Sequence, residues 1–240
     1  MNVLFPPLRA LRAISTPLAR RGASSAASAA LVATLTLLAA CDAPTAARPD
    51  FAYDPTQLSE GQLYRWPTGQ TIRVWADVGI GVAPFDLQQA VRQAIATWNA
   101  QPRFGEFVME LAPSASQANL IVFDRSRPLP IVPGSCAFDA RASFGYTYFC
   151  ANAGRAERLA LASGASSTVS VVIRVDRSLV ADQAGLNAIV AHEFGHALGI
   201  GAHSPESTDL MFGLPRVSAP SPRDMRTLQY VLGAVPDITL

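Results

Sequence analysis

Apolar and polar positions along the chain repeat with two different periods, one typical of strands and one typical of helices. Residues 71–76 change from polar to apolar at every second position, which predicts a half-buried strand. Residues 85–99 carry apolar side chains at the spacing of a core-facing helix, at positions 87, 91, 94, 95 and 98. Apolar runs at 120–123 and 169–175 predict two buried strands. The chain therefore combines strands and helices.

Two more helices are predicted in the second half of the chain. Residues 186–191 form an apolar run that Asp182 can cap, and Gly199 permits the backbone to leave this helix with a positive φ. Residues 192–203 continue it and read His-Glu-Phe-Gly-His-Ala-Leu-Gly-Ile-Gly-Ala-His, a stretch that contains all three histidines of the chain. Residues 224–232 predict a closing helix.

The histidine stretch has the spacing of a metal site on a helix. Residues four apart lie about 40° from each other around the helix axis, so His192 and His196 share one face and can bind the same ion. Glu193 lies about 100° further round, within reach of a water molecule on that ion, which is the position of a general base. A turn at Gly199 would bring His203 to the metal.

The stretch as a whole resembles a known family of peptidases. The zinc-binding motif of the metzincins resembles His192-Glu193-x-x-His196-x-x-Gly199 followed by His203. The residue types at 192–199 are similar to those of the matrixin branch, the matrix metalloproteinase type. In that pattern the third histidine follows the glycine by three residues, whereas His203 follows Gly199 by four. A one-residue insertion in the turn accounts for the difference.

The position of Met211 indicates on which side of His203 this insertion lies. Residues 207–212 resemble the methionine turn that lies beneath the zinc site in metzincins, and Met211 follows His203 by eight residues, the interval common in matrixins. The insertion therefore lies before His203, and His203 stays in register with the turn.

The resemblance implies an α+β fold for residues 65–240. The family's domain has a twisted mixed β-sheet, a first long helix, an active-site helix and a C-terminal helix. It also implies a zinc-dependent endopeptidase with one catalytic Zn²⁺ held by His192, His196 and His203, in which Glu193 is the general base for the water that attacks a peptide carbonyl. Met211 is expected to pack under the ligands without coordinating.

A protein or peptide substrate is expected to bind in an extended form along an edge strand. Residues 169–175 are the candidate strand, with Val171 and Ile173 as candidate substrate-binding residues. In the family, the segment after the methionine turn forms the wall of the main specificity pocket, which makes Phe212 and Leu214 further candidates and suggests an apolar preference. Phe212 and Leu214 are equally consistent with core positions.

Other interpretations of the histidine stretch remain open. A bare His-Glu-x-x-His can arise by chance in an apolar helix, in which case these are ordinary core or surface histidines. Asp209 is an alternative ligand if His203 cannot reach the metal. The alternative function is a non-catalytic lipoprotein that keeps the metzincin fold and binds zinc or peptide, and a third is hydrolysis of a non-peptide amide.

The beginning of the chain predicts export. Arg20 and Arg21 precede an apolar run at 29–40, which is typical of a signal-peptide core and too short to be a permanent membrane span. Residues 38–41, Leu-Ala-Ala-Cys, resemble a bacterial lipobox. We therefore expect removal of residues 1–40, a lipid on Cys41, and a bacterial membrane anchor that faces the periplasm or the cell exterior. Cleavage by ordinary signal peptidase would instead release a secreted protein.

Cys136 and Cys150 form an even pair once Cys41 carries a lipid. In an oxidising compartment they are expected to form a disulfide, which would close a loop of about 15 residues and stabilise the fold by about 3 kcal/mol. Two buried free thiols are the alternative. No histidine lies outside 192–203, so no histidine-bound structural zinc is expected, and no cluster of carboxylates between Asp124 and Thr168 supports calcium.

Composition excludes one class of partner. Four of the 19 basic residues lie in residues 1–40, which leaves 15 against 18 acidic residues and a net charge of −3. A domain with this balance is not expected to bind nucleic acid. Residues 41–64 are rich in Pro, Ala, Thr and Gln and predict a tether. The rest has the size of one domain, expected to be monomeric.

Overall fold

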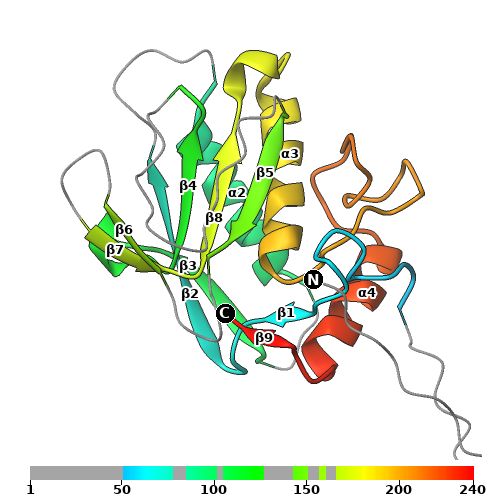
Figure 1. Cartoon of the computed structure of the whole chain (residues 1–240). Coiled ribbons are helices and arrows are strands. Elements are labelled where there is room, and N and C mark those ends of the chain that lie inside the picture. Colours follow the sequence, from blue (N-terminus) through cyan, green and yellow to red (C-terminus); the bar gives the residue numbers. More distant parts are fainter. Residues whose placement is uncertain (1–50, 78–84, 102–104, 127–142, 151–156, 161–165) are drawn as a thin grey trace, which may run out of the picture. The chain divides into compact units, whose positions relative to one another are not determined.

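A mixed five-stranded sheet forms the centre of this α+β fold, in the order β3-β2-β4-β8-β5 (Figure 1). The computed structural model describes residues 51–77, 85–101, 105–126, 143–150, 157–160 and 166–240. Four strands of the sheet are parallel: β2 (Gln70–Asp77), β3 (Phe107–Leu111), β4 (Leu120–Asp124) and β8 (Val171–Val175). The strand β5 (Gly145–Phe149) pairs antiparallel with β8 and forms one edge.

The burial of each strand follows its pattern in the sequence. The central strands β4 and β8 are buried along their whole length, as expected for near-continuous apolar runs covered on both faces. In β2, buried residues alternate with more exposed ones, which confirms the predicted half-buried strand. One face of each of these three strands contributes side chains to the main hydrophobic core.

The part of the chain that the structure describes contains three α-helices. The first, α2 (Leu87–Asn99), buries Leu87, Val91 and Trp98, and confirms the helix predicted from its apolar spacing. The second, α3 (Gln183–Ala197), is capped as predicted by Asp182, whose side chain accepts a hydrogen bond from the backbone N of Gly185. Both helices pack against one face of the sheet (Figure 1).

The third helix, α4 (Pro222–Gly233), begins with a capping box. Ser221 accepts hydrogen bonds from the backbone N of Arg223 and Asp224, and Asp224 accepts one from the backbone N of Ser221. This helix confirms the predicted closing helix.

Short elements complete the fold. Two-residue strands β1 (Tyr64–Arg65) and β9 (Ile238–Thr239) pair in parallel, and β6 (Glu157–Ala160) pairs with β7 (Ser166–Val169). The 3₁₀ turns are η1 (Ala115–Gln117) and η2 (Arg177–Leu179). On the sheet face opposite α2 and α3, a smaller cluster includes Ile121, Tyr148, Cys150 and Val172. No helix among the described residues is both long enough and apolar enough to span a bilayer.

The structure corrects the predicted boundary between tether and domain. Residues 49–240 form one compact unit, so residues 51–64 belong to the domain and not to the tether. Tyr53 is only 8% exposed, and its hydroxyl donates a 2.7 Å hydrogen bond to Oδ1 of Asp224. Leu63 is buried as well, and its backbone N donates to Asp237. A few widely spaced apolar anchors fix a segment whose composition is otherwise that of a linker.

The structure also corrects the predicted edge strand. Residues 169–175 comprise the end of β7 and all of β8, and β8 lies between β4 and β5. Val171 and Ile173 are fully buried, and both sides of their strand are paired. They cannot bind a substrate, and among the described strands the edge on this side of the sheet is β5.

Cys150 is fully buried and disulfide-bonded. Its partner, Cys41 or Cys136, lies outside the described residues, so the pairing with Cys136 stays a prediction. The signal segment 1–40 and the lipidation of Cys41 also fall on residues outside the described part.

Replacing Tyr53 by Phe should destabilise the domain by about 1–3 kcal/mol, because the buried Asp224 carboxylate loses one of its donors. Urea unfolding of the protein without residues 1–42 measures this change. Tyr230→Phe is the matched control, since Tyr230 packs its ring edge-on against Phe51 and its hydroxyl has no hydrogen bond to any described residue. Equal free energies of unfolding for the two variants would show that the Tyr53 hydroxyl does not hold this segment in place.

Candidate metal centre

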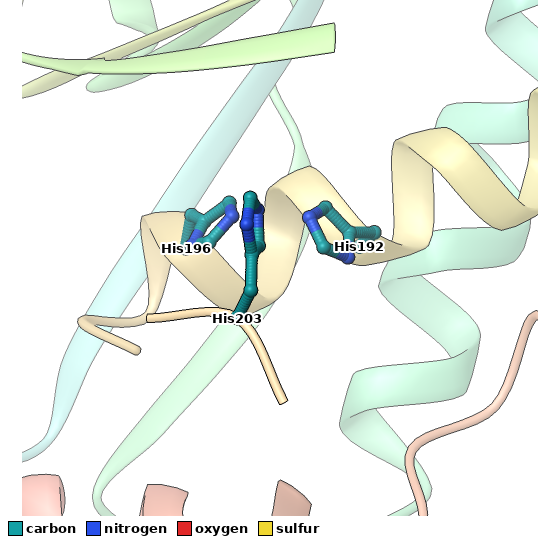
Figure 2. Close-up of side chains that lie close together, drawn as sticks. All are labelled: His192, His196 and His203. Atoms are coloured by element: carbon teal, nitrogen blue, oxygen red, sulfur yellow. The ribbon is translucent and has the colours of Figure 1, made fainter. Parts of the chain in front are cut away.

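The helix α3 presents two histidines on one face, and the loop after it supplies the third (Figure 2). The ring centroids of His192 and His196 are 4.6 Å apart, and that of His203 lies 5.2 Å from each. One ring nitrogen from each residue lies within 4.8 Å of the others. Nitrogens that share one tetrahedral ion at about 2.0–2.1 Å lie about 3.4 Å apart, so a small inward movement of the rings would fit them to a metal.

Hydrogen bonds fix the tautomers of the two helical histidines. The Nδ1 of His192 lies 2.8 Å from the carbonyl oxygen of Leu210, and the Nδ1 of His196 lies 2.6 Å from that of Ile200. A carbonyl oxygen only accepts, so each Nδ1 carries the proton and donates it. The lone pair of each Nε2 is thereby free for a metal, in the arrangement common to metal-binding histidines.

Desolvation favours the neutral form of the three imidazoles. Burial lowers the pKa of His192 to about 4 and the pKa of His196 well below its ordinary value, and partial desolvation lowers the pKa of the more exposed His203. Because only neutral imidazole binds a metal, the cluster is in its ligand form at neutral pH.

The turn after α3 brings His203 to the cluster, although it is one residue longer than in the motif that the sequence resembles. Gly199 has a φ of 103°, as predicted, and a Cβ at this position would collide with the backbone oxygen of Tyr64. The carbonyl oxygen of Gly201 accepts a 2.6 Å hydrogen bond from the backbone N of Leu58, and a Cβ on Gly201 would lie 2.7 Å from the oxygen of Pro55. The turn is thus packed against the N-terminal segment, and His203 still joins the cluster.

Asp209, the alternative ligand, lies outside the histidine cluster. Its Oδ2 accepts hydrogen bonds from the hydroxyl of Ser204, at 2.5 Å, and from Nε of Arg223, at 3.0 Å. The carboxylate is therefore engaged in holding the loop, and the structure favours His203 as the third ligand.

Met211 packs against α3 at Gly195. It is fully buried, and a Cβ on Gly195 would overlap its sulfur, so the Met211 side chain rests against the helix backbone between His192 and His196. The backbone N of Leu210 donates a 2.9 Å hydrogen bond to Asp224. The methionine turn thus positions the carbonyl oxygen that orients His192.

Glu193 is buried beside the cluster and hydrogen-bonded to the edge strand. It is 5% exposed, and its Oε2 lies 2.6 Å from the hydroxyl of Thr147. Burial raises the pKa of Glu193 to about 7, and the hydrogen bond from Thr147 opposes this rise. A carboxyl group with such a pKa can both accept and release a proton near neutral pH.

A cleft of about 1050 Å³ opens over the three histidines and Glu193. Strand β5 lines it, together with residues from 58–64, 179–189 and 213–215. Tyr64 and Phe149, both in its wall, stack with ring centroids 4.3 Å apart. Several exposed apolar side chains also line the cleft: Leu58, Phe144, Tyr146, Leu179 and Leu214.

The predicted substrate-binding residues separate in the structure. Leu214 is 55% exposed in the wall of the cleft, whereas Phe212 is partly buried and does not line it. Val171 and Ile173 lie in the sheet interior. No local pattern in the sequence marks Gly145 and Thr147, which contact Glu193 from a strand distant in the chain.

Comparison with known protein families finds no family model that matches the chain. No curated protein matches it either.

His203→Ala should weaken binding of Zn²⁺ by at least about 100-fold. Loss of an outer-shell partner alone weakens metal binding by about 10- to 100-fold, and loss of a ligand should cost at least as much. Competition with a chromophoric chelator measures the affinity. Glu206→Gln, an exposed change in the same loop, should leave it unchanged. Wild-type affinity in His203→Ala would show that the third ligand is another residue.

Proposed function

We propose that the protein is a zinc-dependent endopeptidase of the matrixin-like metzincin type. One observation carries this proposal: three neutral imidazoles converge beside a buried carboxyl group at the base of an open cleft. The spacing of these residues and of Met211 in the sequence agrees with the metzincin motif, apart from the inserted residue. The α+β fold with an active-site helix against a mixed sheet is consistent with that family.

The donor set favours zinc among the divalent metals. Three histidines with an open fourth position are typical of catalytic zinc sites, whereas calcium and magnesium prefer oxygen ligands. When bound, zinc would lower the pKa of a water molecule and polarise the carbonyl of the scissile bond. His192, His196 and His203 would hold it.

Glu193 would move the proton. Its carboxylate would accept a proton from the attacking water and deliver it to the leaving amine. The raised pKa of Glu193 supports both steps, because a carboxyl group of ordinary acidity would hold the proton too weakly to act as the acid afterwards.

The outer edge of β5, on the side away from β8, is the proposed binding site for the substrate backbone. This strand lines the cleft and pairs only with β8 among the described residues. An extended peptide would add to it by main-chain hydrogen bonds, which are largely independent of sequence. Leu214 and the other exposed apolar side chains of the cleft favour peptides with apolar side chains.

We further propose that the domain is exported and monomeric, and anchored to a bacterial membrane by a lipid on Cys41. The folded domain is a compact unit from residue 49, so a short segment after Cys41 would serve as the tether. Secretion without a lipid is the alternative.

The alternative function is a non-catalytic lipoprotein with this fold that binds zinc or peptide. Its main support was the inserted residue before His203, and the convergence of the three histidines removes that support. Hydrolysis of a non-peptide amide remains a third candidate, which substrate panels separate from peptide hydrolysis.

Glu193→Ala should lower kcat for peptide hydrolysis by about 100- to 10,000-fold while zinc stays bound, because the general base is lost and the ligands are kept. The protein without residues 1–42 would be assayed with casein and a peptide library, and its zinc content measured. Glu110→Gln on the exposed edge strand β3 is the control and should retain full activity. Stoichiometric zinc without cleavage of any peptide by the wild type would favour the binding protein.

A further inference from the structure

Two residues of β5 face the Glu193 carboxylate together. Gly145 and Thr147 lie two positions apart and therefore share one face of the strand, the face toward α3. The helix and the strand run side by side (Figure 1). The strand proposed to bind substrate on its outer edge thus also contacts the proposed general base.

The hydroxyl of Thr147 holds one oxygen of this carboxylate. Its Oγ1 lies 2.6 Å from Oε2 of Glu193 and 3.1 Å from the backbone oxygen of the same residue. A hydroxyl has a single proton to donate, and the carboxylate oxygen is the closer acceptor. Glu193 is buried, so the loss of this donor would leave Oε2 without its hydrogen bond from the strand.

The other oxygen occupies the space that a side chain at position 145 would fill. A Cβ on Gly145 would overlap Oε1 of Glu193 and would lie 2.8 Å from its Cγ and Cδ. The absence of a side chain at Gly145 therefore gives the carboxylate room to lie against the strand. Gly145 and Thr147 together define one orientation of the Glu193 carboxylate, whose terminal torsion angle otherwise has a broad distribution.

We propose that Thr147 is a positioning residue for the general base. It fixes Oε2 through a donated hydrogen bond and leaves Oε1, in the space at Gly145, as the oxygen that accepts the proton. This inference rests on the proposed function, because it assigns a task to Glu193. A base held in one orientation avoids the loss of rate that misplacement of a reacting group causes.

Thr147→Val removes the hydroxyl and keeps the shape of the side chain. It should lower kcat for a peptide substrate by about 10- to 100-fold, the cost typical of losing an outer-shell partner, with KM and zinc content close to the wild type. Thr147→Ser restores the hydroxyl and should recover most of kcat. The same isosteric change at Thr71 in β2, outside the cleft, should have no effect on kcat.

Crystal structures of the metal-free wild type, Thr147→Val and Thr147→Ser provide a readout independent of activity. The Glu193 carboxylate should keep its orientation in the wild type and in the serine variant, and should rotate away from β5 in the valine variant. Gly145→Ala is a second route to the same displacement, with the Thr147 hydroxyl intact, and should also lower kcat.

The outcomes separate the inference from the function. Wild-type kcat and an unmoved carboxylate in Thr147→Val would overturn the positioning role, as would a serine variant as slow as the valine variant. Thr147→Val could instead lose zinc or fail to fold, while Thr147→Ser and Gly145→Ala keep the wild-type kcat. This result would assign Thr147 a purely structural role and overturn the inference. A wild-type protein that cleaves no peptide would contradict the proposed function, while the crystal structures would still decide whether Thr147 orients Glu193.

Discussion

The fold depends on the burial of polar side chains in a helix that is covered on all sides. Every residue of α3 from Leu186 to Ala197 is buried, and two imidazoles and a carboxyl group lie among them. Buried polar groups are costly unless each finds a hydrogen-bond partner, and α3 uses its own backbone groups internally. The partners therefore come from other segments: the methionine turn, the turn after the helix and the strand β5. Of these segments, the strand β5 and the turn after the helix also line the cleft.

A second set of hydrogen bonds extends this requirement to the ends of the domain. Asp224 at the start of α4 accepts from the backbone N of Leu210, and the carbonyl oxygen of Leu210 accepts from His192. The hydroxyl of Tyr53 donates to the same Asp224, so residues near both ends of the domain share one carboxylate that holds the methionine turn. Loss of order at either end would thus reach the orientation of His192, through three hydrogen bonds from Tyr53 and two from Asp224. This connection explains why a segment with linker-like composition is part of the folded domain.

The sequence predicted what depends on local pattern and missed what depends on the order of strands. Helix α2 follows from its apolar spacing, the start of α3 from its cap at Asp182, and the turn at Gly199 from the need for a positive φ. An apolar run such as 169–175 has the same appearance in an edge strand and in an interior strand, because pairing on its second side is decided by a distant segment. The contact between Thr147 and Glu193 was beyond prediction for the same reason. It requires β5 to lie against α3, and nothing local in either segment encodes that arrangement.

Two chain segments flank His203, and hydrogen bonds constrain the length of one of them more than the length of the other. The backbone N of Ser204 donates a 2.7 Å hydrogen bond to the oxygen of Met211, so the segment from His203 to the methionine turn is closed by its own backbone. A change of length there would break this bond and move the ligand relative to the turn. The segment between Gly199 and His203 is a turn instead, and Gly201 uses its added length to accept a hydrogen bond from Leu58. The turn packs against the N-terminal segment, and the three rings converge although the spacing is one residue longer than in the metzincin motif that the sequence resembles.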